Sequence, residues 1–169
     1  MTTNSTLTST DRLPEHAPRL DWIALAPEVF KALVRLDTAV RKGVDPTLLE
    51  LVKIRASQIN RCALCVDMHS KDALAAGESV ERIIQLSAWQ ESAHFYTARE
   101  VAALGLTEAI TVLTDGFVPD DVYARAAAQF DDTELAHLIG AITAINAFNR
   151  FGVSTRSVPG HYTPAAHAH

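Results

Sequence analysis

The chain has 169 residues, 48% of them hydrophobic, and a formal net charge of −5. This is enough for one domain with a buried core that needs no disulfide support. Acidic and basic residues are interspersed, and the sequence has no stripe of basic residues that could bind the phosphates of a nucleic acid. We therefore expect no nucleic-acid partner. No apolar run reaches the length that spans a bilayer, so we expect no membrane partner either.

Residues 1–18 are rich in Thr and Ser and lack both a basic start and an apolar stretch. They do not resemble a secretory signal, and we interpret them as a flexible or partner-docking arm of a cytoplasmic protein. Residues 19–155 are expected to form a single helical domain. The polar segment 156–169 is expected to be an extended C-terminal tail.

All regular elements are predicted to be helices, because caps and helical apolar spacing recur and no alternating strand pattern does. The first predicted helix begins at Pro27, which suits a first helical position, and ends at Gly43. Asp45 followed by Pro46 then caps a second helix that runs to Ile59. The chain is therefore predicted to belong to the all-α class.

A third helix is expected to begin near Asn60 or Arg61 and to end at Gly77. Ser79 caps a short helix as far as Leu86. Bulky or polar side chains near the predicted loop that follows are candidates for a pocket or for packing at a subunit contact. These are Trp89, His94, Phe95 and Tyr96.

Three cap signals mark the last helices. Thr97 and Glu100 have the spacing of a capping box and open an apolar helix to about Thr114. Another helix begins near Pro119, and Asp131 with Glu134 caps the last one, which is predicted to end at Gly152. Because this last helix is apolar around much of its circumference, we expect it to be buried on several sides, partly by a second subunit.

The only two cysteines of the chain lie three residues apart. On a helix, Cys62, Cys65 and His69 fall within roughly 60° of one another. A helix start supplies unpaired N–H groups and the positive end of the dipole, which stabilise a thiolate. His69 can accept the thiol proton, and a carboxylate beside it can take the proton onward. Glu50 is the candidate carboxylate, because it lies among apolar residues where a charge requires a partner.

Each of these residues also has a plainer interpretation. The cysteines alone are compatible with two packed thiols, and Glu50 alone with a helix-face charge paired with Lys53 or Arg55. A zinc site is a third interpretation, but two thiolates and His69 leave a fourth ligand to be found. The remaining candidates for that ligand are distant histidines, namely His137, His161, His167 and His169. We therefore expect no metal and no other cofactor.

The run ELVKIRASQINRCALCVDMHSKDALAAGE, which begins at Glu50, resembles the alkylhydroperoxidase D-like (carboxymuconolactone decarboxylase) superfamily. Segments 57–60, 88–92, 97–100 and 146–152 are similar to its peroxidase-related branch. The resemblance covers about residues 20 to 160. It implies an all-α, AhpD-like helical bundle that is intertwined in a homo-oligomer, as a dimer, trimer or hexamer.

The resemblance also implies a thiol-dependent peroxidase, an antioxidant enzyme that reduces alkyl hydroperoxides and is recovered by a thiol donor, such as a dihydrolipoyl-type donor. Glu50, Cys62, Cys65 and His69 match the proton-relay positions of the family. By this likeness, Cys65 attacks the peroxide to form a sulfenic acid, and Cys62 resolves it to a disulfide. The helix-start argument instead favours Cys62 as the thiol of lower pKa, so the two roles stay open.

Two departures from the family pattern keep further alternatives open. Leu64 stands where peroxidase members carry a histidine, so the substrate is either a hydroperoxide or a protein or small-molecule disulfide. Arg61 stands where many relatives have glycine. A cation there is able to lower a thiol pKa or to recognise an anionic substrate, but an exposed arginine at a helix start needs neither role and usually has little effect. The rival functions are a non-enzymatic redox-sensing module, a helical bundle with inert thiols, and a decarboxylase of the carboxymuconolactone type, which does not require the cysteine pair.

Overall fold

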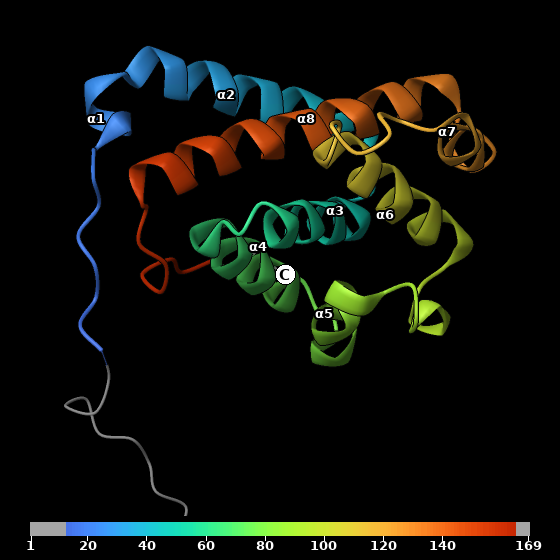
Figure 1. Cartoon of the computed structure of the whole chain (residues 1–169), viewed down its shortest axis with the longest axis horizontal. Coiled ribbons are helices and arrows are strands. Elements are labelled where there is room, and N and C mark those ends of the chain that lie inside the picture. The colour runs from blue at the N-terminus through green and yellow to red at the C-terminus, as the bar shows by residue number, and fades with distance from the viewer. Residues whose placement is uncertain (1–12, 165–169) are drawn as a thin grey trace, which may run out of the picture.

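The computed structural model describes residues 13–164, and the regular elements in this range are helices without any strand (Figure 1). The longer helices are α2 (Pro27–Val40), α3 (Pro46–Ile59), α4 (Ala63–Ala75), α6 (Ala98–Thr111) and α8 (Asp132–Thr155). The shorter elements are α1 (Trp22–Leu25), η2 (Arg41–Gly43), α5 (Val80–Gln85), η3 (Leu86–Ala88), η4 (Ala93–Phe95) and α7 (Asp120–Ala127). The predicted all-α class is confirmed. Within the described residues, no helix combines the length and apolarity needed to cross a bilayer.

The predicted helix caps are confirmed. The Asp45 side chain accepts a hydrogen bond from the Leu48 backbone N–H, with Pro46 in the first turn of α3. Complete capping boxes open α6 and α8, so the first unpaired N–H groups of both helices are satisfied. These local signals determine where the helices start.

Three predicted boundaries are wrong. The helix that opens at Thr97 was expected to reach about Thr114 but ends at Thr111, and the other two errors lie beside the cysteines. The third helix begins at Ala63 because Arg61 has φ 56°, a left-handed conformation that ends α3 and makes Cys62 the N-cap of α4. The last helix does not end at Gly152 but continues to Thr155 and ends at Arg156, whose φ is 54°. The short helix α1 was not predicted from the sequence.

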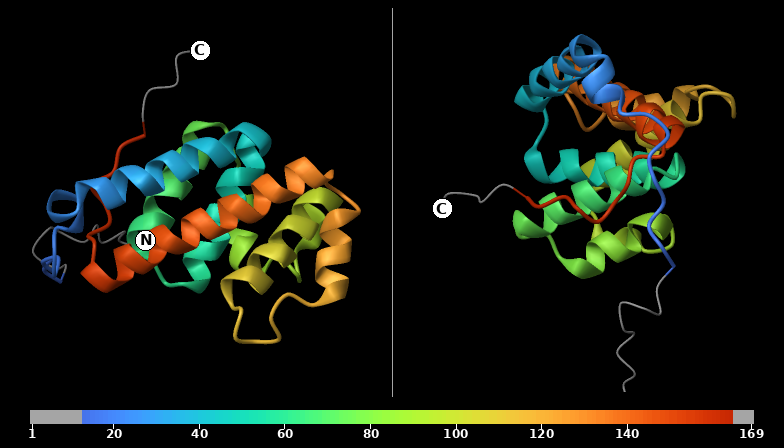
Figure 2. Two further views of the ribbon diagram at one scale, coloured as in Figure 1. Left: turned by 90° about the horizontal axis from the view of Figure 1, so that it is seen from above. Right: turned by 90° about the vertical axis from the view of Figure 1, so that its left-hand side faces the viewer.

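The long helix α8 lies at the centre of the molecule. It contacts α2, α3, α4, α6 and α7, and Figures 1 and 2 show α2 and α8 forming one layer over α3 and α4, with α5 on the far side. Its apolar residues join the main core, including Leu138 and Ile142, which are fully buried. Helices of the same chain therefore bury apolar surface of α8 for which the sequence suggested a second subunit.

The two ends of the described chain lie against different helices, the N-terminal end at the end of α8 and the C-terminal end along α4. Arg19 donates its backbone N–H to the Thr155 carbonyl oxygen at 2.7 Å, and the Gly160 N–H is donated to Asp67 on α4 at 3.0 Å. The Tyr162 hydroxyl donates to Asp72 Oδ1 at 2.6 Å. Residues 1–12 of the predicted arm and residues 165–169 of the predicted tail lie outside the described range.

Candidate active site

Cys62 and Cys65 lie at the start of α4 as free, buried thiols, with their Sγ atoms 2.8 Å apart. They pack with Ala56 of α3 and Ile145 of α8. A disulfide brings two sulfurs to about 2.05 Å. The pair is therefore reduced here, and only a short movement separates it from the oxidised form.

The two thiols differ in acidity. The hydrogen bond from Cys65 lowers the pKa of Cys62 to about 7 although burial raises it, and the backbone N–H groups of Cys65 and Leu64 and the Asn149 amide contribute to the lowering. The same hydrogen bond and burial raise the pKa of Cys65. A single negative charge on the pair is therefore held by Cys62, at the positive end of α4.

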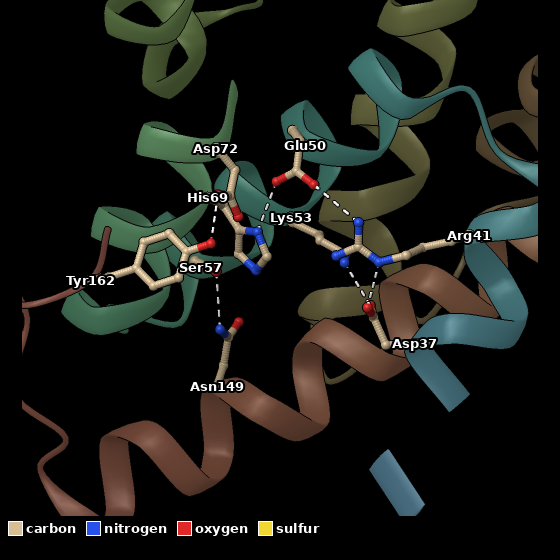
Figure 3. Close-up of polar contacts among 9 residues, drawn as sticks. All are labelled: Asp37, Arg41, Glu50, Lys53, Ser57, His69, Asp72, Asn149 and Tyr162. Atoms are coloured by element: carbon tan, nitrogen blue, oxygen red, sulfur yellow. Dashed lines mark hydrogen bonds and ion pairs between the residues drawn. The ribbon is translucent and has the colours of Figure 1, made fainter. Parts of the chain in front are cut away.

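His69 and Glu50 are brought together across α4 and α3. His69 Nδ1 lies 2.8 Å from Glu50 Oε2, and both side chains are buried (Figure 3). A carboxylate at Nδ1 fixes the neutral tautomer that carries its proton there and leaves Nε2 as an acceptor. Because Cys65 lies four residues before His69, the two side chains are neighbours on one helix face.

The Glu50 carboxylate is held in its charged form. Burial acts to raise its pKa, but the His69 hydrogen bond and the nearby charges of Lys53 and Arg41 outweigh burial, and the pKa is lowered. Arg41 Nη1 lies 3.7 Å from Glu50 Oε1. Glu50 is therefore ready to stabilise a positive charge that forms on His69.

A second ion pair adjoins this couple and was not predicted. Lys53 is only 1% exposed and donates to Asp37 Oδ1 at 2.5 Å, while Arg41 donates to the other oxygen of Asp37 at 2.6 Å (Figure 3). Burial lowers the pKa of Lys53, although the Asp37 charge acts to raise it. The sequence offered Lys53 or Arg55 as the partner of Glu50, but neither is its closest partner.

A cavity of about 330 Å³ meets this cluster of side chains. Cys65 and His69 line it, whereas Cys62 does not. Most of the wall is apolar and comes from α1, α2, α4 and α8, including Trp22, Phe30, Leu64, Met68, Ile145 and Phe148. None of the four pocket candidates from the sequence lines this cavity, and Trp89, Phe95 and Tyr96 pack in a separate core cluster instead.

Within residues 13–164, one group of side chains has the spacing of metal ligands. Ligand atoms of Glu50, His69 and Asp72 lie within 4.8 Å of one another, and neither cysteine belongs to the group. Asp72 already accepts the Tyr162 hydroxyl, and the Arg41 guanidinium adjoins Glu50. A cation would have to displace these bonds and lie next to a positive charge, so the arrangement suits proton transfer better than metal binding.

Sequence reasoning missed the buried polar groups that α8 places beneath the dithiol. Asn149 is fully buried and donates to Ser57 Oγ at 3.0 Å. The signal in the sequence was the presence of Asn146 and Asn149, one turn apart, in a helix that is otherwise apolar on this face. Two such amides in an apolar environment require partners, but the spacing does not identify them.

The family model of the carboxymuconolactone decarboxylase family matches residues 27–109. The uncharacterized protein YdfG of Bacillus subtilis is 38% identical over 137 residues, which are 80% of this chain and 92% of that protein. Alkyl hydroperoxide reductase AhpD of Rhodopseudomonas palustris is 40% identical over 52 residues, which are 31% of this chain and 29% of that protein.

Two solved structures have a similar fold. A protein of unknown function from Agrobacterium tumefaciens, proposed to be the antioxidant defence protein AhpD, has a TM-score of 0.83 and 38% identity, covering 86% of this chain and 100% of that chain. A peroxidase-related protein from Ralstonia eutropha with an alkylhydroperoxidase AhpD core has a TM-score of 0.72, with coverage of 86% and 78%. At 17% identity, the second likeness shows the fold alone.

Proposed function

We infer from this site, in a chain that belongs to the carboxymuconolactone decarboxylase family, that the protein is a thiol-dependent peroxidase that reduces alkyl hydroperoxides in antioxidant defence. The observation that carries the proposal is the reduced Cys62–Cys65 pair at 2.8 Å, with Cys65 at a cavity that is also lined by His69, the partner of Glu50. The two cysteines supply the two electrons of the reduction. His69, supported by Glu50, supplies a base that becomes an acid when it has accepted a proton.

Cys65 begins the reaction, because it is the sulfur that lines the cavity. Its raised pKa means that it carries the proton at rest, so His69 Nε2 accepts that proton while Glu50 stabilises the imidazolium. The Cys65 thiolate attacks the terminal oxygen of the hydroperoxide, the O–O bond breaks, and Cys65 becomes a sulfenic acid. The departing alkoxide takes the proton from His69 and leaves as the alcohol.

Cys62 completes the oxidation. With a pKa of about 7 it is substantially a thiolate near neutral pH, and it attacks the Cys65 sulfur. The S–O bond breaks, the departing hydroxide is protonated to water, and the disulfide forms. An external dithiol, of which a dihydrolipoyl-type donor is one candidate, then returns two electrons by thiol–disulfide exchange.

Reduction of a disulfide is the second candidate function. It is favoured by Leu64, which lines the cavity in the position where the resembled peroxidases carry a histidine. Cys62 and Cys65 are only 2% and 4% exposed, so a small disulfide that enters the cavity fits this alternative better than a folded protein does. A redox sensor would use the same dithiol without repeated turnover, and a decarboxylase would not need the sulfurs.

Homo-oligomerisation remains part of the proposal. Several apolar side chains of the segment around α1 and α2 are exposed, namely Leu20, Ile23, Leu25, Val29, Val34 and Leu36. Exposed apolar residues gathered on neighbouring elements are typical of protein–protein contact surfaces. Their presence supports assembly of this chain with further copies, in line with the resemblance.

A steady-state assay with an organic hydroperoxide and a dihydrolipoyl-type donor tests this function. We expect continuous turnover by the wild type and loss of turnover in both Cys65→Ser and Cys62→Ser. Consumption of only one equivalent by the wild type would instead indicate a sensor. Equal rates for all three proteins would refute the peroxidase, and turnover with a small disulfide but not with a hydroperoxide would select the second candidate.

A further inference from the structure

The two cysteine sulfurs pack against the α8 backbone at Gly152, which has no side chain. A Cβ atom placed on Gly152 would lie 2.8 Å from Cys62 Sγ and 3.9 Å from Cys65 Sγ. The first distance is shorter than a carbon and a sulfur can approach, so any side chain here would displace the sulfur. Asn149 precedes Gly152 by three residues and therefore lies on the same face of α8, one turn away.

The Asn149 amide has a fixed orientation. Its Oδ1 accepts a hydrogen bond from Asn60 Nδ2 at 2.9 Å, and its Nδ2 donates to Ser57 Oγ at 3.0 Å. Figure 3 shows the Asn149 side chain pointing from α8 toward Ser57, with His69 beyond it. Exchanging the oxygen and nitrogen of this amide would place two donors against each other at Asn60, so the N–H₂ end is held toward α3 and the start of α4.

One donor of this amide is left over. A primary amide nitrogen has two N–H groups, and Ser57 takes one of them. Asn149 is 0% exposed, so bulk solvent does not take the other, and a buried N–H group requires an acceptor. Of the two sulfurs, Cys62 Sγ lies closer to the face of α8 that Asn149 shares with Gly152 and is the acceptor that this face favours. The Asn149 side chain acts to lower the pKa of both Cys62 and Cys65.

We propose that Asn149 is a positioning residue of the dithiol, which donates its second side-chain N–H to Cys62 Sγ and holds the negative charge on that sulfur, while Gly152 leaves room for it. The importance of this contact for turnover rests on the peroxidase function proposed above. In the resolving step, the Asn149 N–H keeps Cys62 deprotonated and directed at Cys65. Asn149 itself transfers no proton and touches no substrate.

The first test compares two neighbouring asparagines. Asn149→Ala removes the donor, Asn149→Asp keeps the shape but replaces the donor by an acceptor with a like charge, and Asn146→Ala is the matched control. Asn146 also accepts a hydrogen bond from Asn60, but its own N–H₂ donates to Thr111 Oγ1 and the Ile142 carbonyl oxygen. The readout is the pH dependence of alkylation of the reduced protein, with mass spectrometry locating the adduct on Cys62.

We expect the alkylation profile of Cys62 to move upward by about one pH unit in Asn149→Ala and further in Asn149→Asp. At neutral pH, the Asn149→Ala shift corresponds to a several-fold slower alkylation. The profile of Asn146→Ala should match that of the wild type. An unshifted profile in Asn149→Ala, or an equal shift in Asn146→Ala, would overturn the proposal.

A measurement on the wild type covers the case in which the Asn149 variants do not fold. The side-chain amide resonances of the isotope-labelled, reduced protein are followed against pH. We expect the Asn149 N–H signal to titrate with Cys62, near pH 7, and the Asn146 signal to stay constant. A constant Asn149 signal would overturn the proposal. Neither readout uses a peroxide, so an inactive protein that shows both effects would refute the proposed function and leave the role of Asn149 intact.

Discussion

The helix α3 carries two clusters of buried or half-buried charges, one on each side. On one side, Glu50 meets His69 at 2.8 Å. On the other side, Arg55 Nη2 lies 2.6 Å from Glu108 Oε1 on α6, and Glu108 also accepts hydrogen bonds from Trp89 Nε1 and Gln90 Nε2 at 2.7 and 2.9 Å. Each cluster centres on a carboxylate with several donors.

The two carboxylates differ in what their partners can do. The indole, amide and guanidinium groups around Glu108 keep their protons at any ordinary pH, so this cluster joins α3, α6 and the segment after η3. The partner of Glu50 is an imidazole, a group that can both accept and donate a proton, and it lies at a cavity beside Cys65. Burial of a charge therefore does not identify a candidate functional carboxylate, whereas a partner that can accept and donate a proton next to a reactive atom does.

The largest difference between the clusters is expected for matched amide substitutions. Glu50→Gln removes the negative charge that stabilises protonated His69, and we expect kcat with an organic hydroperoxide to fall about 10²- to 10⁴-fold. Glu108→Gln should keep kcat near that of the wild type, because Glu108 does not line the cavity of the dithiol. Equal losses of kcat in the two variants would remove the distinction between the clusters.

The buried lysine on the Glu50 side should matter for stability. Lys53→Met leaves Asp37 with Arg41 as its remaining ion-pair partner, and we expect a loss of about 2 kcal/mol in the free energy of unfolding. The cost is moderate because Asp37 keeps the Arg41 hydrogen bond at 2.6 Å. The double variant Asp37→Leu/Lys53→Met should recover most of the loss in urea denaturation. A double variant that is less stable than Lys53→Met would contradict this account.

Two helical glycines allow a similar comparison. Gly152→Ala forces a Cβ toward Cys62 Sγ, and we expect it to destabilise the reduced protein by about 2 kcal/mol. Gly105→Ala, in α6, meets no atom within 4 Å and should stabilise the protein by about 0.5–1 kcal/mol through helix propensity. Urea denaturation measures both. A Gly152→Ala protein as stable as the wild type would show that the sulfurs do not need this space.

The smallest expected effect is the acid dependence of the Glu50 contribution. The folded pKa of Glu50 lies below its ordinary value of 4.5. A carboxylate with a lowered folded pKa contributes stability that is fully present above the unfolded pKa and is lost as the pH falls through the folded pKa. We expect the wild type to lose stability relative to Glu50→Gln as the pH falls below 4.5. Thermal unfolding over a pH series checks this, and a constant difference would argue against an ionised Glu50.

The sequence predicts the helices well because their starts are encoded locally. A Thr or Asp followed three residues later by Glu satisfies its own helix start, whatever lies around it. The break between α3 and α4 was misplaced because it depends on Arg61 in a left-handed conformation, which glycine or asparagine would have signalled and arginine does not. The end of α8 was predicted too early, because Gly152 was interpreted as a glycine that ends a helix. The sequence does not distinguish such a glycine from one that is packed against a sulfur within a helix.

Part of the candidate site was also within reach of sequence reasoning. Glu50 and His69 lie on consecutive helices that a short turn folds back on each other, so their helix faces could be matched. The contact of Asn149 with Ser57 joins residues 92 positions apart, and the depth of Lys53 depends on how α2 crosses α3. Such contacts follow from packing over the whole fold, which no local spacing encodes.

Stoichiometric oxidation tests the central claim most directly. The reduced protein is mixed with one equivalent of an organic hydroperoxide per chain, without a donor, and the products are determined by mass spectrometry. We expect one Cys62–Cys65 disulfide and one alcohol per chain in the wild type, and a sulfenic acid on Cys65 in Cys62→Ser. Reduced cysteines beside unconsumed hydroperoxide would contradict the account.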